Sequence, residues 1–277
     1  MKSTMEVNLL PLLLAVLLMA AFPRVHAQDA KSSPSQDRLI TSIDLSHSLE
    51  AKSGWRFMVA QGPNTTDPAM MDTVPGKIRL CITQDGGVSC SPSLNGVLCL
   101  SSGNDQYSDP RYLNDVRIVR PRANRPILLM QVASQQSVNG NQRLATVALA
   151  YDHIHNSLAL VYEKQTGKNN DEEIRYIADG PPMGAIISAE PTSDAPFGFW
   201  ITVNRLGASG DYNQVLRYRS ATRYNDGNRL AVIDSEMPGI LQRFHLWHPG
   251  MHIPRPAEVC AEPHLIGQEM WCQSASR

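Results

Sequence analysis

Along most of the chain after residue 38, apolar residues alternate with polar ones or run in blocks of four to eight. Gly, Asn, Asp and Pro separate these blocks, a combination typical of short strands joined by turns. The segments with this pattern are 77–82, 116–119, 127–133, 144–151, 157–163, 173–178, 199–203, 214–219 and 229–234. No long stretch has the 3.6-residue period of a helix, and at most a short helix fits residues 240–247. The pattern predicts an all-β, antiparallel fold.

Candidate hairpin turns recur at a regular spacing. Asp85-Gly86, His155-Asn156 and Asp226-Gly227 lie 70 and 71 residues apart, and the apolar blocks before them recur at a similar offset. Three copies of a unit of about 70 residues would explain this spacing, because one such unit cannot bury its own face and must stack on the next. We expect a propeller-like or three-fold β assembly, with a two-sheet β-sandwich as the alternative.

The first residues have the features of a secretory signal peptide. A basic start at Lys2 precedes a 14-residue apolar run over residues 9–22, and Val25-His26-Ala27 supplies a cleavage site after Ala27. As a helix the run would cover only ~21 Å of a roughly 30 Å hydrocarbon core, so a membrane anchor is the weaker interpretation. We expect a signal peptide over 1–27, a polar leader over 28–38 and one β-domain over 39–277. The protein is then secreted or periplasmic, and no later segment is apolar enough to span a membrane.

The charge of the exported chain is nearly balanced. Residues 1–27 carry two of the 25 basic and one of the 26 acidic side chains, which leaves 23 and 25, a net charge of −2. This balance gives no electrostatic attraction to nucleic acid or to anionic membranes, so nucleic acid is not an expected partner.

The cysteines fit an oxidising compartment. There are five: Cys81, Cys90, Cys99, Cys260 and Cys272. A two-residue turn at Asp85-Gly86 places Cys81 opposite Cys90, with Cα atoms about 4.5 Å apart, which is within reach of a disulfide. Cys260 and Cys272 enclose a short segment near the carboxyl terminus and form the second expected bridge, which leaves Cys99 unpaired. The competing arrangement joins Cys90 to Cys99.

Arginine and aromatic residues gather in one predicted strand. Arg217, Arg219 and Arg223 fall on one strand face and Tyr218 on the other, next to the aromatic stretch that ends at Trp200. Guanidinium groups hold acidic sugars and flat rings stack on sugar faces, so these five residues are the candidate ligand site. The alternative is a solvated strand face over an ordinary core face.

Two other clusters carry candidate chemistry. His245, His248 and His252 could hold a metal ion if the first two lie one helical turn apart, although neither HExxH nor another closed zinc signature is present. Asp234 and Glu236, two apart on a predicted strand, would have carboxylates roughly 7 Å apart, a spacing that inverting glycosidases use.

The same turn arithmetic gives those carboxylates a structural alternative. A turn at Asp226-Gly227 places Asp234 opposite Arg219 and Glu236 opposite Arg217, and such ion pairs help to fix strand register. Pairing also favours the ionised carboxylate, which is the wrong state for a general acid.

The segment VLRYRSATRYNDGNRLAVIDSEMP (215–238) resembles a block in uncharacterised exported bacterial proteins. This resemblance implies a periplasmic or extracellular bacterial setting and no particular activity. No GxSxG, GxxxxGK[ST], GxGxxG or EF-hand pattern is present, so we expect no cofactor and no catalytic residue from these classes. The sequence favours an exported, non-catalytic β-protein that binds an envelope or extracellular ligand such as a glycan. A secreted hydrolase using the histidine cluster or Asp234 and Glu236 is the rival.

Overall fold

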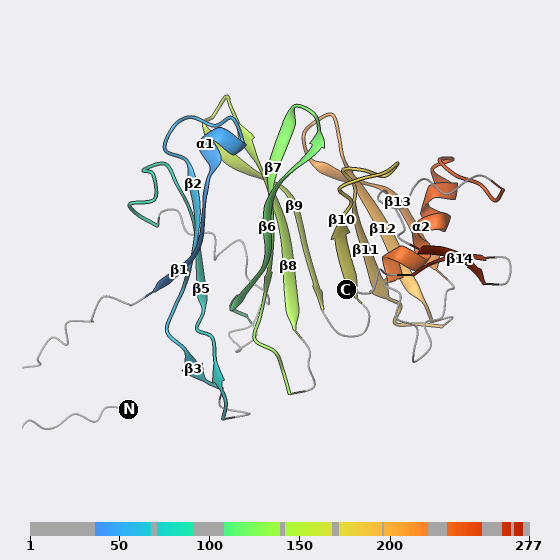
Figure 1. Cartoon of the computed structure of the whole chain (residues 1–277), viewed down its shortest axis with the longest axis horizontal. Coiled ribbons are helices and arrows are strands. Elements are labelled where there is room, and N and C mark those ends of the chain that lie inside the picture. The colour runs from blue at the N-terminus through green and yellow to red at the C-terminus, as the bar shows by residue number, and fades with distance from the viewer. Residues whose placement is uncertain are drawn as a thin grey trace, which may run out of the picture. The chain divides into compact units, whose positions relative to one another are not determined.

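The computed structural model is mostly antiparallel β-structure, as predicted (Figure 1). It describes residues 37–67, 71–90, 108–138, 142–167, 172–195, 197–220 and 232–250, and the backbone of 262–266 and 269–273. All of these belong to one unit, Ser35–Arg277. The predicted signal peptide, Cys99, Arg223, His252 and Cys260 lie outside the described residues, and Cys272 is described only by its backbone.

Three larger sheets follow one another along the chain. The first sheet contains β1 (Arg38–Asp44), β2 (Arg56–Gln61) and β5 (Ile78–Thr83). The second contains β6 (Tyr112–Arg122), β7 (Arg125–Ala133), β8 (Arg143–Asp152) and β9 (Ser157–Gly167), and the third β10 (Glu173–Tyr176), β11 (Ile186–Pro191), β12 (Phe199–Leu206) and β13 (Tyr212–Ser220). In each sheet, hydrogen-bonded neighbours follow the order of the chain among that sheet's strands, with every pair antiparallel. The 70-residue repeat stays a prediction.

Smaller elements complete the fold. Two strand pairs are β3 (Thr65–Thr66) with β4 (Thr73–Val74) and β14 (Glu262–Ile266) with β15 (Glu269–Gln273), and the two helices are α1 (Leu45–Ser48) and α2 (Val232–Arg243). Within the described part of the chain, neither helix has the length and apolar character needed to cross a bilayer.

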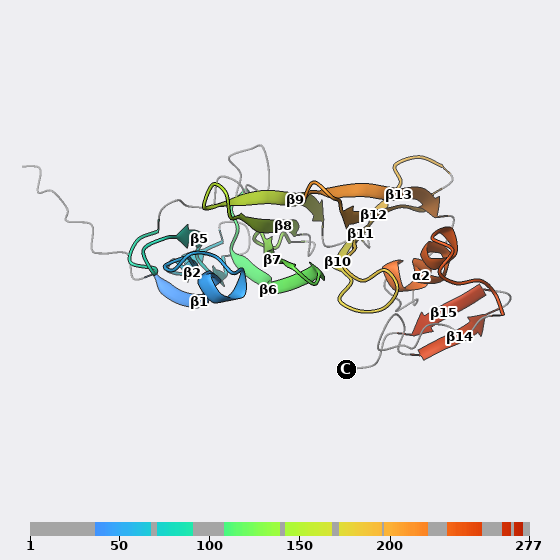
Figure 2. The ribbon, with the colours of Figure 1, turned by 90° about the horizontal axis from the view of Figure 1, so that it is seen from above.

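The inner strands of the second sheet, β7 and β8, are buried on both faces along most of their length, which explains their continuous apolar sequences. Along β7, Leu128, Met130 and Val132 pack into a core shared with the first sheet. The alternate residues Ile127 and Leu129 pack into a second core that includes residues of the third sheet. Because neighbouring side chains of a strand point to opposite faces, a strand between two cores needs apolar residues at every position. Figure 2 shows β6–β9 between the other two sheets.

The predicted disulfide is present, but the predicted hairpin around it is wrong. Cys81 and Cys90 are bonded, with Cα atoms 5.0 Å apart. However, β5 pairs with β2, and residues 84–90 form no strand. Instead, the Asp85 carboxylate accepts hydrogen bonds from the amides of Gly87, Val88 and Ser89 at 2.9–3.1 Å. The Ser89 hydroxyl, with help from Thr83 and the backbone, lowers the pKa of Asp85 to about 2. Local capping, rather than strand pairing, brings the two cysteines together.

The carboxyl-terminal helix is a second difference from the sequence prediction. Residues 229–234 were expected to form a strand, yet α2 begins at Val232 and runs to Arg243 despite Pro238. Its buried residues fall in pairs about one turn apart: Val232 and Ile233, Glu236 and Met237, Ile240 and Leu241. They cover an apolar face of the third sheet. Tertiary burial therefore outweighs the short alternating pattern that suggested a strand.

Removing the Cys81–Cys90 bridge should destabilise the fold. We expect the Cys81→Ala/Cys90→Ala double variant to lose about 2–3 kcal/mol of unfolding free energy, because the bridge closes a short loop of the unfolded chain. Urea denaturation of oxidised protein measures the loss. Reductant should reduce the stability of the wild type by more than that of the double variant, which keeps only the expected Cys260–Cys272 bridge; equal stability of the two oxidised proteins would contradict a structural role.

Candidate functional site

The third sheet has two chemically different faces. Along β12, Phe199, Ile201 and Val203 pack against α2. The alternate residues Trp200 and Thr202 lie on the opposite face. The pairing of β12 with β11 and β13 extends the same two faces over all three strands. We define the polar face as two rows of Cα partners: Glu190–Trp200–Arg219 and Ser188–Thr202–Arg217. Alternation in three adjacent strands thus places six mainly polar side chains together, with the apolar ones behind them.

Arg217 is the one exposed residue among the six that define the polar face, and it lies against the partly buried Trp200. The guanidinium carbon of Arg217 lies 4.4 Å from the centre of the Trp200 ring, and that of Arg219 lies 5.9 Å from it. Arg217 is exposed and makes no hydrogen bond or ion pair with the described residues. The Arg217 guanidinium is stacked on a face of the Trp200 ring, where the sequence predicts that a sugar would stack. The N–H groups of Arg217 therefore have no acceptor in the described part of the chain, and the indole supports the guanidinium from one side.

Arg219 is held differently from Arg217. Its Nη2 donates to the backbone carbonyl of Asp194, and its Nη1 lies 3.4 Å from the Asp194 carboxylate. The side chain of Arg219 is 24% exposed, whereas that of Asp194 is 71% exposed. Arg219 thus lies at the end of the row that contains Trp200 and adds positive charge. Some of its N–H groups are already engaged by Asp194.

An ion pair from the second sheet completes the polar face. Lys164 of β9 donates to Oε1 of Glu190 on β11, and the two side chains are 23% and 39% exposed. Lys164, Arg217 and Arg219 supply three positive charges, against two negative charges from Glu190 and Asp194. The site has a net charge of +1 and favours an anionic ligand.

Three hydroxyl groups are buried behind this ion pair. Tyr162 and Thr166 are each two residues from Lys164 on β9, and Ser188 is two residues from Glu190 on β11, so each shares a strand face with its charged neighbour. All three residues are at most 8% exposed, and their hydroxyl oxygens have no hydrogen-bond partner in the described part of the chain. Burial raises the pKa of Tyr162, and the charge of Glu190 raises it further, so this phenol stays a donor at physiological pH.

Tyr218, the remaining predicted ligand residue in the described chain, lies on the other face. Its hydroxyl donates to Oε2 of Glu236 at 2.9 Å, and the Arg243 guanidinium lies 3.7 Å from its ring centre. Ser220 donates to the second oxygen of Glu236. Tyr218 points to the opposite face of β13 from Arg217 and Arg219, as predicted. It therefore contacts α2 and does not belong to the polar face.

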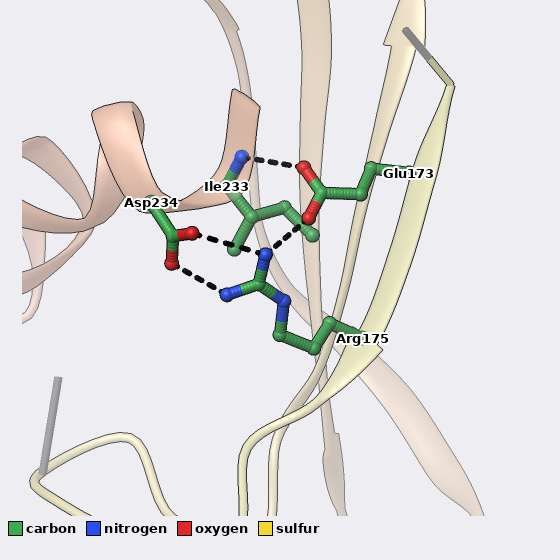
Figure 3. Close-up of polar contacts among 4 residues, drawn as sticks. All are labelled: Glu173, Arg175, Ile233 and Asp234. Atoms are coloured by element: carbon green, nitrogen blue, oxygen red, sulfur yellow. Dashed lines mark hydrogen bonds and ion pairs between the residues drawn. The ribbon is translucent and has the colours of Figure 1, made fainter. Parts of the chain in front are cut away.

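The expected cross-strand ion pairs of Asp234 and Glu236 are not formed, because both residues are in α2 rather than in a strand. The strand partners of Arg219 and Arg217 are Trp200 and Thr202. Asp234 instead forms a two-pronged ion pair with Arg175 of β10, in which Nη2 lies 3.2 Å from Oδ2 (Figure 3).

Glu173 connects this ion pair to the first turn of α2. Its Oε1 accepts from Arg175, and its Oε2 accepts from the backbone amide of Ile233 at 2.9 Å (Figure 3). Burial opposes protonation of Arg175, but the hydrogen bond with Asp234 and the charge of Glu173 outweigh it and raise the pKa of Arg175. The cluster therefore anchors and caps the start of α2.

The predicted helical spacing of His245 and His248 is also wrong. The helix ends at Arg243, and His245 has a left-handed backbone with φ 57°. His248 is exposed and its Nδ1 lies 3.0 Å from the Pro249 carbonyl. Within the described residues, no three His, Cys, Asp or Glu side chains form a group that could hold a metal ion.

Sequence reasoning missed Lys164, Ser188 and Glu190. The signal for the last two was present in residues 186–190, where Ile, Ser, Ala and Glu give apolar and polar side chains in alternation. Lys164 could not be found this way, because its contact with Glu190 joins different sheets.

Comparison of the chain with protein-family models, with curated proteins and with solved structures gives no match. Its function is therefore argued from the geometry above.

Neutralising Asp234 should affect the fold rather than ligand binding. We expect Asp234→Asn to lower the unfolding free energy by about 1–2 kcal/mol, because Arg175 loses a partly buried anionic partner. Urea denaturation measures this loss. Asp211→Asn removes an exposed carboxylate in the turn just before β13 and is the matched control, with a change within about 0.5 kcal/mol. A wild-type stability for Asp234→Asn would contradict the anchoring role.

Proposed function

We propose that this protein is an exported, non-catalytic β-protein whose polar face binds an acidic glycan of the cell envelope or the extracellular space. The observation that carries the proposal is the exposed Arg217 guanidinium, which is stacked on Trp200 and has no acceptor in the described part of the chain. Stacking restricts the orientation of the side chain, so its donors lose less conformational freedom when a ligand carboxylate binds.

The charge around Arg217 supports an anionic ligand. Three positive side chains lie here, those of Lys164, Arg217 and Arg219. They face two negative ones, those of Glu190 and Asp194. A planar carboxylate matches the fork of a guanidinium and accepts two parallel hydrogen bonds from it. Uronic acids carry such a carboxylate, and the apolar run at residues 9–22 is the basis for placing the protein where glycans of this kind occur.

The rival function, a secreted hydrolase, has less support. Asp234 is paired with Arg175, and Glu236 accepts hydrogen bonds from Tyr218 and Ser220. These contacts satisfy the two carboxylates within the interface between α2 and the third sheet. A binding function uses the exposed groups of the opposite face and requires none of the groups in this interface.

Replacing Arg217 should abolish most of the binding. We expect the full protein without its signal peptide to bind polygalacturonate in calorimetric titration, and to bind neutral dextran much more weakly. Arg217→Gln should weaken polygalacturonate binding by roughly 10- to 100-fold, because it removes a charge-assisted pair. Arg205→Gln, on the other face of β12, is the matched control and should bind as the wild type does.

Three outcomes would overturn the proposal. They are no binding of polygalacturonate by the wild type, equal binding of dextran, and equal binding by Arg217→Gln. Release of new reducing ends from polygalacturonate would favour the hydrolase instead.

A further inference from the structure

We infer that Glu190 recognises ligand hydroxyl groups, so that the ligand is a sugar acid with hydroxyls beside its carboxylate rather than any polyanion. This inference rests on the proposed function and names the chemical class that the polar face selects. Glu190 lies in one row with Trp200 and Arg219, and Arg217 lies in the next row. A carboxylate and a set of arginines on one sheet face suit a ligand that carries both an acid and hydrogen-bond donors.

Glu190 has acceptor capacity to spare. Lys164 donates to its Oε1, while its Oε2 receives no hydrogen bond from the described residues. The side chain is 39% exposed, so this oxygen is within reach of a ligand on the sheet face. An ionised carboxylate has about four acceptor positions and no donor, so it binds hydroxyl groups and repels acidic ones.

The ion pair with Lys164 allows the Glu190 carboxylate to lie in a site that binds anions. Two like charges a few ångströms apart repel each other, and an isolated Glu190 would weaken the binding of an acid at Arg217. The ion pair with Lys164 offsets this repulsion and fixes the position of Glu190 across the boundary between β9 and β11. An acid without hydroxyls then gains only from the arginines, and a neutral sugar only from Glu190. A sugar acid gains from both.

The test compares three polymers: polygalacturonate, polyacrylate and dextran. Polyacrylate carries carboxylates without hydroxyls, and dextran carries hydroxyls without carboxylates. We expect the wild type to bind polygalacturonate at least about 10-fold more tightly than polyacrylate per carboxylate. Glu190→Gln should weaken polygalacturonate binding by about 10-fold and leave polyacrylate binding unchanged or tighter, because it removes an acceptor and a negative charge together.

Two further variants complete the experiment. Glu163→Gln changes an exposed carboxylate on the opposite face of β9 and should bind both acidic polymers as the wild type does. Tyr162→Phe removes a buried hydroxyl that has no described partner and that a ligand on the sheet surface cannot reach, so neither its stability in urea nor its preference for polygalacturonate should fall. This combination separates ligand recognition from a merely structural role.

The outcomes distinguish this inference from the proposed function. Wild-type protein that binds neither acidic polymer overturns the proposed function and this inference with it. Wild-type protein that binds polygalacturonate and polyacrylate equally, or a Glu190→Gln variant that weakens both in parallel, overturns the role of Glu190 alone.

Discussion

The two-residue alternation of side chains in β11, β12 and β13 is the constraint on which the rest of this structure depends. It places Ile201 and Val203 under α2 and leaves Trp200 and Thr202 on the opposite face. A shift of register by one residue would exchange the two faces, exposing the apolar residues and burying the charged ones. The apolar contact with α2 therefore fixes the position of the polar face, so packing on one side of the sheet determines which side chains are presented on the other.

Much of the β-structure could be predicted from the sequence, because its strands have local patterns. The apolar blocks that became β7 and β8 are visible without any knowledge of their neighbours. The pairing of Cys81 with Cys90 was also predictable, although the reason differs: capping by Asp85, rather than a hairpin, closes that loop. The short spacing in the sequence was enough to predict the pair, although it did not reveal the capping.

The start of α2 could not be predicted in the same way. Residues 229–234 alternate like a strand, and Pro238 disfavours a helix. A helix nevertheless begins at Val232, because its apolar residues pack against the apolar face of the third sheet. The Arg175–Asp234 ion pair joins residues 59 apart in sequence, and the Lys164–Glu190 pair joins residues 26 apart. Such contacts depend on how the sheets pack, which no local pattern contains. For this reason Lys164 could not be found from the sequence, whereas the arginines, Trp200 and Glu190 all lie in segments with a local alternating pattern.

We propose that α2 and the Glu173–Arg175–Asp234 cluster stabilise the fold and that the opposite face of the same sheet recognises an acidic sugar. Nuclear magnetic resonance of the indole N–H groups tests this division most directly, because the chain has four tryptophans. Titration with oligogalacturonate should shift the indole resonance of Trp200, which supports Arg217, and leave those of Trp55 and of Trp247 behind α2 unchanged. A shift at Trp247 or Trp55 with no change at Trp200 would contradict the account.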